Sequence, residues 1–308
     1  MSPYIKILRP SNCLIVGLTQ FLVYFLLFLP IIEVPSLNNL TLFALILATM
    51  IVTASGFVIN DIIDRDLDAI NKSDKKLVGA FINLSSAWRY YYLLIGIGFM
   101  LSLFVAYSCG ELGLIWLYPL MVLLLWMYSQ YWKGRAVIGN LVVSLFTAFV
   151  PGLLLVAERK AINQAIMDER SGIYYFLISV TTYMLFAFLS NLTRELIKDI
   201  EDVEGDRMVG HRTLPVVVGV RKSKMVAMVY ASCILIILFF CNIFFVQFSI
   251  TLAWIITSIV LIPINAFILF KIYKASERSD FSFVSNQLKL FMVLGLVSIL
   301  TISHYLYS

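Results

Sequence analysis

Two groups of acidic residues lie where long apolar segments of this chain end. The first, called here the first acidic motif, is the stretch Asn60-Asp61-Ile62-Ile63-Asp64-Arg65-Asp66-Leu67-Asp68. The second acidic motif lies between Glu195 and Asp206. Carboxylates beside an apolar segment are expensive to keep there and are usually functional. These residues are therefore the ones in this chain best suited to carry out chemistry.

Spacing places the polar residues of the first motif on one side of a helix. Because a helix turns by about 100° per residue, Asn60, Asp64 and Asp68 share one stripe and Asp61 lies at its flank. We expect this row of oxygen atoms to form if the apolar helix continues into the motif.

The second motif has the same property. Glu195, Asp199, Asp202 and Asp206 cover only about 60° of a continuing helix. Two such rows would repel each other unless cations lay between them. Hard oxygen ligands, one or two carboxylates for each ion, suit Mg²⁺, which also prefers to share a phosphate ligand.

Basic residues accompany both motifs: Lys72, Lys75, Lys76, Arg194, Lys198, Arg207 and Arg212. Carboxylates together with lysine and arginine indicate a phosphate group bridged by magnesium, with metal ions and protein cations neutralising its charge. The simpler alternative is that the carboxylates are only polar helix ends in water. Three or four of them on one face of each helix fit that alternative poorly. For a basic residue outside the motifs, a role in topology or in binding anionic lipid remains an alternative.

The elements that position these residues are membrane helices. The chain of 308 residues is 61% hydrophobic and only 13% charged, whereas soluble domains are about 25% charged. The apolar segments are long and show no alternation of polar and apolar residues, which excludes a membrane barrel. The predicted fold class is all-α: a polytopic membrane protein with nine transmembrane helices in one bundle.

Each predicted span has about twenty residues, the length that a hydrocarbon core of ~30 Å requires. We predict spans over residues 13–32, 40–60, 88–108, 112–130, 137–156, 173–197, 224–246, 249–270 and 285–307. Polar loops of about twenty residues are expected after the second and sixth spans, and this repetition suggests two related halves. No linker divides the chain, so we interpret residues 1–308 as a single domain.

The distribution of basic residues predicts the orientation. Apart from Arg159, Lys160 and Arg170 after the fifth span, nearly all basic residues near the span ends fall on one side. That side should be cytoplasmic. We therefore expect an integral protein of the cell's inner membrane, with the N-terminus and the acidic motifs in the cytoplasm and the C-terminus outside.

The acidic motifs resemble those of the UbiA-type intramembrane prenyltransferases. The first is similar to that family's NDxxDxxxD motif, and Asp199-Ile200-Glu201-Asp202-Val203-Glu204-Gly205-Asp206 is similar to its second motif. Shorter similarities are Leu8-Arg9-Pro10-Ser11-Asn12, Tyr128-Ser129-Gln130-Tyr131-Trp132-Lys133 and Gly139-Asn140-Leu141. The resemblance covers essentially the whole chain.

Within the family, the segment from Arg194 to Pro215 is most similar to the digeranylgeranylglyceryl phosphate synthase branch. One feature departs from the family pattern Asn-Lys-Pro-x-Arg-Pro. Here Asn71-Lys72-Ser73-Asp74-Lys75-Lys76 lacks both prolines, and Lys75 replaces the arginine. Lysine binds phosphate but lacks the bidentate fork of arginine.

The resemblance implies transfer of a prenyl group from a prenyl diphosphate. It assigns Mg²⁺ as cofactor and Asp64, Asp68, Asp199 and Asp202 as catalytic residues. The metal ligands that it implies are Asn60, Asp61, Asp64, Asp68, Asp199, Asp202 and Asp206. The candidate substrate-binding residues are Arg9, Asn12, Lys72, Tyr128, Lys133, Arg194 and Lys198. Among them, Tyr128 is a candidate for stabilising cationic character through its ring, and Arg9 and Asn12 could contact an anionic acceptor.

Several alternatives remain open at this stage. The leading reaction is geranylgeranyl transfer to a prenylglyceryl phosphate, and the runner-up is prenylation of an aromatic acceptor such as 4-hydroxybenzoate or a quinone precursor. A divalent-cation or phosphate carrier is the alternative from another class, since acidic residues in membranes often line ion paths. The expected partners are a prenyl diphosphate, a lipid or aromatic acceptor and membrane lipid; nucleic-acid binding is not expected.

Overall fold

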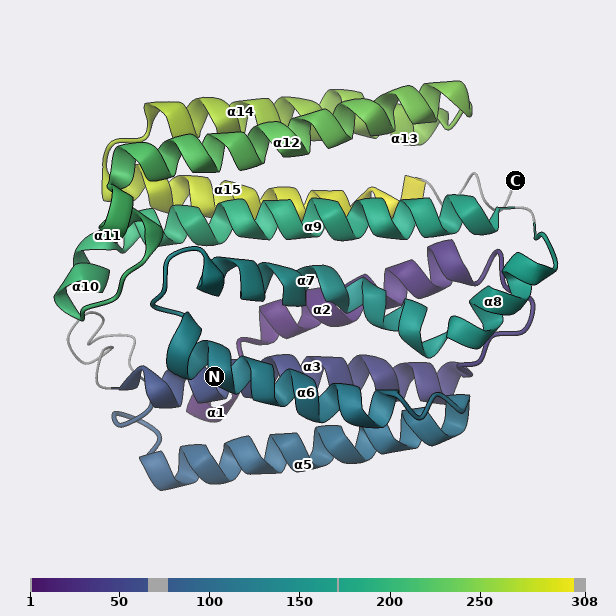
Figure 1. Ribbon diagram of the computed structural model, residues 1–308, viewed down its shortest axis with the longest axis horizontal. Coiled ribbons are helices and arrows are strands. Elements are labelled where there is room, and N and C mark those ends of the chain that lie inside the picture. The colour runs from purple at the N-terminus through teal and green to yellow at the C-terminus, as the bar shows by residue number, and fades with distance from the viewer. Residues whose placement is uncertain (1, 66–76, 171, 302–308) are drawn as a thin grey trace. The chain divides into compact units, whose positions relative to one another are not determined.

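The computed structural model describes residues 2–65, 77–170 and 172–301 (Figure 1). Over these residues the chain is helical, and its β-structure is limited to isolated bridges. Nine of the described helices are long and apolar enough to cross a membrane. They are Pro10–Phe28, Asn39–Ile63, Leu84–Cys109, Leu114–Trp132, Ile138–Ala157, Ile173–Glu201, Val220–Gln247, Thr251–Lys274 and Arg278–Thr301. The all-α membrane class is thereby confirmed.

The helix ends differ from the prediction, because hydropathy marks only the apolar part of a helix. The third span begins at Leu84 rather than at 88, where the Asn83 side chain accepts the Ser86 N–H at 2.8 Å. The seventh begins at Val220 rather than at 224. The ninth begins at Arg278 rather than at 285, after a capping box between Glu277 and Asp280. Such caps satisfy backbone N–H groups, so a helix can begin within polar sequence.

The chain divides into two compact units, and each unit contains one acidic motif. Unit 1 comprises Met1–Phe21, Val34–Lys133 and Leu153–Met167. Unit 2 comprises Leu22–Glu33, Gly134–Gly152 and Asp168–Ser308. The single-domain interpretation stays a prediction.

In unit 1, the helix that carries the first motif is α3 (Asn39–Ile63). It packs against α5 (Leu84–Cys109) and α6 (Leu114–Met127), as Figure 1 shows. Val58, Ile59 and Ile62 in its last turns are buried in one apolar cluster with residues of α5 and of the segment before it. The motif therefore begins on a helix end that apolar packing holds in place.

The opposite end of unit 1 is joined by polar contacts. Glu158 is fully buried and accepts the backbone N–H groups of Ser36 at 2.7 Å and Leu37 at 2.9 Å. Its neighbours also have acceptors there: Arg159 pairs with Glu111 at 3.0 Å, and Lys160 donates to the Gly110 carbonyl at 2.8 Å.

In unit 2, Arg170 pairs with Glu33 and holds the pKa of that carboxyl below its ordinary value by hydrogen bonding and by its charge. Arg159, Lys160 and Arg170, the basic residues that the sequence places on the less basic side of the membrane, thus each have an acceptor.

In unit 2, the second motif lies at the end of α9 (Ile173–Glu201). Figure 1 shows α9 beside α12 (Val220–Gln247) and α15 (Arg278–Val297), and α14 (Ile262–Lys274) packs against both of the latter. Leu196, Ile197 and Ile200 join the buried core of these four helices. Apolar packing therefore continues up to the turn that contains Asp199.

The remaining α-helices are one whole span, parts of two other spans and four short helices outside the spans. They are α1 (Pro3–Lys6), α2 (Pro10–Leu22), α7 (Ile138–Ala157), α8 (Arg159–Met167), α10 (Val203–Met208), α11 (Leu214–Val218) and α13 (Thr251–Ile256). Three π-helical segments lie within spans: η1 (Val23–Phe28), η3 (Tyr128–Trp132) and η4 (Thr257–Leu261). The predicted polar loop after the sixth span therefore contains two short helices, α10 and α11.

Candidate active site

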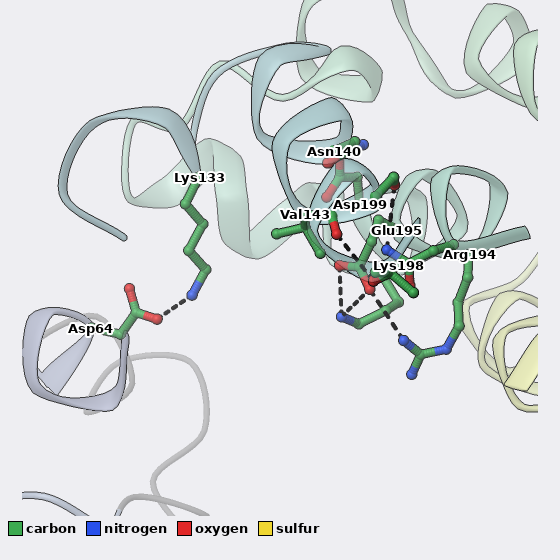
Figure 2. Close-up of polar contacts among 11 residues, drawn as sticks. Asp64, Lys133, Asn140, Val143, Arg194, Glu195, Lys198 and Asp199 are labelled. Carbon is green, nitrogen blue, oxygen red and sulfur yellow. Dashed lines mark hydrogen bonds and ion pairs between the residues drawn. The ribbon is translucent and has the colours of Figure 1, made fainter. Parts of the chain in front are cut away.

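In unit 1, the first motif occupies the last turns of α3. Asp64 is the residue at which the helix ends, and its backbone N–H bonds to the Asn60 carbonyl at 2.9 Å. Its side chain is only 10% exposed and forms an ion pair with Lys133 (Figure 2). The predicted stripe is therefore present from Asn60 to Asp64, whereas Asp68 and Lys72 lie outside the described residues.

A π-helical turn precedes Lys133. In η3 the Lys133 N–H bonds at 2.9 Å to the carbonyl of Tyr128, five residues earlier. Such wide turns interrupt α-helices and are frequent at functional sites. The segment from Tyr128 to Lys133 therefore ends the helix with a π-helical turn, which changes the direction in which its side chains point relative to an α-helix. This turn, η3, packs against α3.

Arg9 lies against the same helix end. Its guanidinium pairs with Asp61 at 2.9 Å and lies 4.7 Å from the centre of the Phe57 ring. Its backbone φ of 50° is left-handed, which costs a non-glycine residue about 1–2 kcal/mol. Asn12, in the first turn of α2, bonds through its backbone N–H to the Arg9 carbonyl at 2.9 Å. Arg9 therefore has a defined position beside the first motif.

In unit 2, the second motif does not lie on one unbroken helix, and this corrects the sequence-based expectation. The α9 helix ends at Glu201, Asp202 has φ −100° and ψ 12°, and α10 begins at Val203. The backbone still bonds across the break, from the Asp206 N–H to the Asp202 carbonyl at 2.9 Å. The chain changes direction locally because Asp202 leaves helical dihedral angles.

The carboxylates of the second motif each contact a different segment. Asn140 of α7 donates to Asp199 at 2.8 Å (Figure 2). Arg278 at the start of α15 pairs with Asp202 at 3.1 Å. Asp206 contacts His211 Nδ1 at 3.2 Å and accepts from the Thr213 hydroxyl at 3.0 Å. These contacts connect the end of α9 to three other parts of unit 2.

Glu195 lies one turn before Asp199 on α9. It pairs with Arg194 at 3.1 Å and with Lys198 at 3.0 Å, and Figure 2 shows the two cations on this one carboxylate. Both predicted phosphate-binding cations of this motif therefore lie beside a carboxylate in unit 2.

The oxygen ligands of the first motif suit a magnesium ion. Within the part of the chain that the structure describes, no three His, Cys, Asp or Glu side chains already form a metal-binding group. The side-chain oxygen of Asn60 is nevertheless buried and forms no hydrogen bond with any described residue. A buried carbonyl oxygen needs a partner, and Asp64 beside it can exchange its ammonium partner for a metal ion. These residues therefore fit Mg²⁺ by their chemistry.

The model of the UbiA prenyltransferase family matches residues 13–300. The chain belongs to the UbiA prenyltransferase family. It is therefore a prenyltransferase and an integral membrane protein, and the resemblance drawn from the acidic motifs is confirmed.

Curated relatives of this UbiA-family chain point to one branch. A digeranylgeranylglyceryl phosphate synthase of Methanosphaera stadtmanae is 30% identical over 309 residues, covering 97% of this chain and 98% of the relative. A protein of the same name from Methanoculleus marisnigri is 32% identical over 225 residues, covering 72% and 71% of the two chains.

Solved structures share the fold. One, described as giving insights into digeranylgeranylglyceryl phosphate synthase in membranes, has a TM-score of 0.69 and 24% identity, covering 98% of this chain and 97% of that one. A UbiA homologue from Archaeoglobus fulgidus bound to DMAPP and Mg²⁺ has a TM-score of 0.59 and 17% identity, covering 97% and 99%. These similarities establish the UbiA fold for this chain.

Sequence reasoning missed several residues of this UbiA-family site. Arg278 contacts the second motif from a segment with no recognisable spacing relative to it. His211 and Thr213 also contact the motif, and their position within the similarity from Arg194 to Pro215 could have identified them. Asn140 could have been found, because it belongs to the short Gly139-Asn140-Leu141 similarity. The structure brings Lys133 to the first motif and Lys198 to the second.

Proposed function

We propose that this prenyltransferase transfers a geranylgeranyl group to the hydroxyl of a prenylglyceryl phosphate, as digeranylgeranylglyceryl phosphate synthases do. The match to the Methanosphaera relative carries this proposal, because it extends over nearly the full length of both chains. In the reaction, the allylic carbon–oxygen bond of the prenyl diphosphate breaks and an ether bond forms. The acceptor hydroxyl loses its proton, and diphosphate leaves.

Magnesium ions are proposed to bind both acidic motifs. The first would use Asn60, Asp61, Asp64 and Asp68, and the second Asp199, Asp202 and Asp206. When bound, Mg²⁺ neutralises the diphosphate and so makes it a better leaving group. Two observations support this assignment: the Asn60 side-chain oxygen has no partner in the described part of the chain, and the Archaeoglobus homologue binds Mg²⁺.

The protein cations would bind the diphosphate after the metal arrives. Lys133 is paired with Asp64, so a metal ion on that carboxylate would free the ammonium group for a phosphate oxygen. Arg194 and Lys198 share the Glu195 carboxylate, which lies one turn before the proposed metal ligand Asp199. We propose these three cations, together with Lys72, as diphosphate-binding residues.

Further residues would act on the organic parts of the substrates. Arg9, which pairs with Asp61, is proposed to bind the phosphate of the acceptor. Asn12, whose backbone N–H bonds to the Arg9 carbonyl, is proposed to contact the same acceptor. The Tyr128 ring is proposed to stabilise positive charge that develops on the allylic carbon as diphosphate departs. The asymmetry of basic residues supports a cytoplasmic active site and N-terminus.

A product screen by mass spectrometry tests the proposal. Purified protein receives geranylgeranyl diphosphate or shorter prenyl diphosphates, together with a geranylgeranylglyceryl phosphate or 4-hydroxybenzoate. We expect the doubly prenylated glyceryl phosphate and inorganic diphosphate, with Mg²⁺ or Mn²⁺ required. A prenylated aromatic acid alone would move the chain to the aromatic branch. Undiminished turnover in excess EDTA would refute the metal requirement.

A further inference from the structure

Two of the buried side-chain oxygens in unit 1 that have no hydrogen-bond partner among the described residues lie near the end of α3 or in η3, which packs against it. One is Asn60 Oδ1 of the first motif, and the other is the hydroxyl of Ser129 in η3. Ser129 is only 7% exposed. Because burial of an unpaired polar group costs about 1–3 kcal/mol, two such groups in one region call for an explanation.

The serine and threonine hydroxyls in the second half of α3 do not share this feature. Thr49 and Thr53 of α3 donate to the carbonyls four residues earlier, each at 2.8 Å, and Ser55 donates to the Val52 carbonyl at 2.8 Å. Helical serine and threonine commonly satisfy themselves in this way. Ser129 makes no such bond, so its hydroxyl is left for another partner.

Two contacts between α3 and the segment from α6 to η3 bracket Asn60 and Ser129 in sequence, and from them we infer that the two residues lie near the same level. On one side of this pair, a Cβ added at Gly56 would lie 3.2 Å from the Leu125 side chain. On the other side, Asp64 pairs with Lys133. Asn60 lies four residues after Gly56 and four before Asp64. Ser129 likewise lies four residues after Leu125 and four before Lys133. The two unpaired oxygens thus lie between two established contacts of the same helix pair.

The chemistry of the pair indicates what lies between them. Asn60 Oδ1 only accepts hydrogen bonds or binds a cation, and a serine hydroxyl can donate to an oxygen. A divalent cation with its own oxygen ligands satisfies both groups at once. We propose that Ser129 is a further binding residue, whose hydroxyl donates to an oxygen ligand of the metal ion held by Asn60. This inference rests on the proposed metal role of the first motif.

Direct metal binding tests the inference without relying on turnover. Mn²⁺ affinity is measured by electron paramagnetic resonance on the full chain in detergent, with and without inorganic diphosphate. We expect Ser129→Ala to weaken binding about tenfold, the value of a hydrogen bond next to charge. A loss with Mn²⁺ alone identifies a metal-bound water as the acceptor, and a loss only with diphosphate identifies a diphosphate oxygen; both results support the proposal.

Matched variants separate this effect from general damage. Ser55 is also a buried serine of unit 1, but its hydroxyl already donates to a backbone carbonyl. Ser55→Ala should therefore leave Mn²⁺ affinity unchanged. Ser129→Cys keeps the size of the side chain, weakens the donor, and serves if Ser129→Ala does not fold. Because the Ser129 hydroxyl has no partner among the residues that the structure describes, Ser129→Ala should melt no lower than the wild-type protein.

The outcomes also distinguish this inference from the proposed function. If Asp64→Ala loses Mn²⁺ binding while both Ser129 variants retain wild-type affinity, the role of Ser129 is wrong and the metal site stands. If the wild-type protein binds no Mn²⁺ under either condition, the metal role of the first motif fails, and the inference about Ser129 fails with it.

Discussion

The side chain of Lys133 forms an ion pair with the buried carboxylate of Asp64, although 69 residues separate them in sequence. The pair joins the π-helical end of the fourth span to the last turn of the second. It gives a carboxylate that has little access to water a partner of opposite charge. It also means that a metal ion at Asp64 must compete with an ammonium group of the protein.

Removal of a motif carboxylate should abolish catalysis without unfolding the protein. We expect prenyl transfer by Asp64→Ala and by Asp199→Ala to fall below detection, because each loses a proposed metal ligand. The assay is product formation by mass spectrometry, with size-exclusion chromatography in detergent as the measure of folding. Glu204→Ala is the matched control, since Glu204 is exposed in α10 within the same motif. Wild-type rates in either aspartate variant would contradict the mechanism.

Loss of the Lys133 ammonium group should make the protein depend on metal for stability. In Lys133→Met, Asp64 remains buried without its cation, so unfolding should become easier by about 1–3 kcal/mol. Mg²⁺ should then raise the melting temperature more in the variant than in the wild type, because it no longer displaces lysine. Thermal unfolding in detergent with and without Mg²⁺ measures both effects, and Lys133→Arg is the charge-retaining control. If Mg²⁺ raised the melting temperature of Lys133→Met and of the wild type equally, this result would argue against metal binding at Asp64.

Gly134 should be required for the position of the second motif. A Cβ at Gly134 would lie 2.5 Å from Cδ2 of His211, the residue whose ring contacts Asp206. We expect Gly134→Ala to displace the ring and to raise the Mg²⁺ concentration for half-maximal activity by about tenfold or more, as for other residues that orient a metal ligand.

The control for this glycine is Gly96→Ala in α5, where an added Cβ meets nothing within 4 Å. This change should leave the Mg²⁺ dependence unaltered and stabilise the helix by roughly 0.5–1 kcal/mol. If both alanine variants show the same Mg²⁺ dependence as the wild type, the contact between His211 and Gly134 has no influence on the site.

Glu158 should be important for stability rather than for chemistry. Its two oxygens accept the N–H groups of Ser36 and Leu37 in a fully buried position. Glu158→Ala leaves both donors unpaired and should cost about 2–4 kcal/mol of unfolding free energy, whereas Glu158→Gln retains one acceptor oxygen and should cost less. Denaturation in mixed micelles measures the series, and KM for the prenyl diphosphate should not change in protein that remains folded. A melting temperature of Glu158→Ala equal to that of the wild type would rule out this role.

Much of the fold and part of the site could be predicted from the sequence. Hydropathy over about twenty residues is a local property, so the centres of all nine spans were predictable, whereas their ends depended on caps such as the box between Glu277 and Asp280. The spacing of Asn60, Asp61 and Asp64 was enough to identify one face of a helix end. The sequence could not foresee that Asp202 interrupts the second motif, because that depends on the dihedral angles of one residue.

The sequence by itself determined the membrane class, the two acidic motifs and, through them, the family. The tertiary structure alone decided which groups meet. Lys133 reaches Asp64 after a π-helical turn, and Arg278 reaches Asp202 from 76 residues away. Gly56 meets Leu125, and Asp64 meets Lys133, because α3 packs against the fourth span in a fixed register. The physical reason is that periodicity specifies the face of a helix, whereas the partner of that face depends on packing between segments that are distant in the chain.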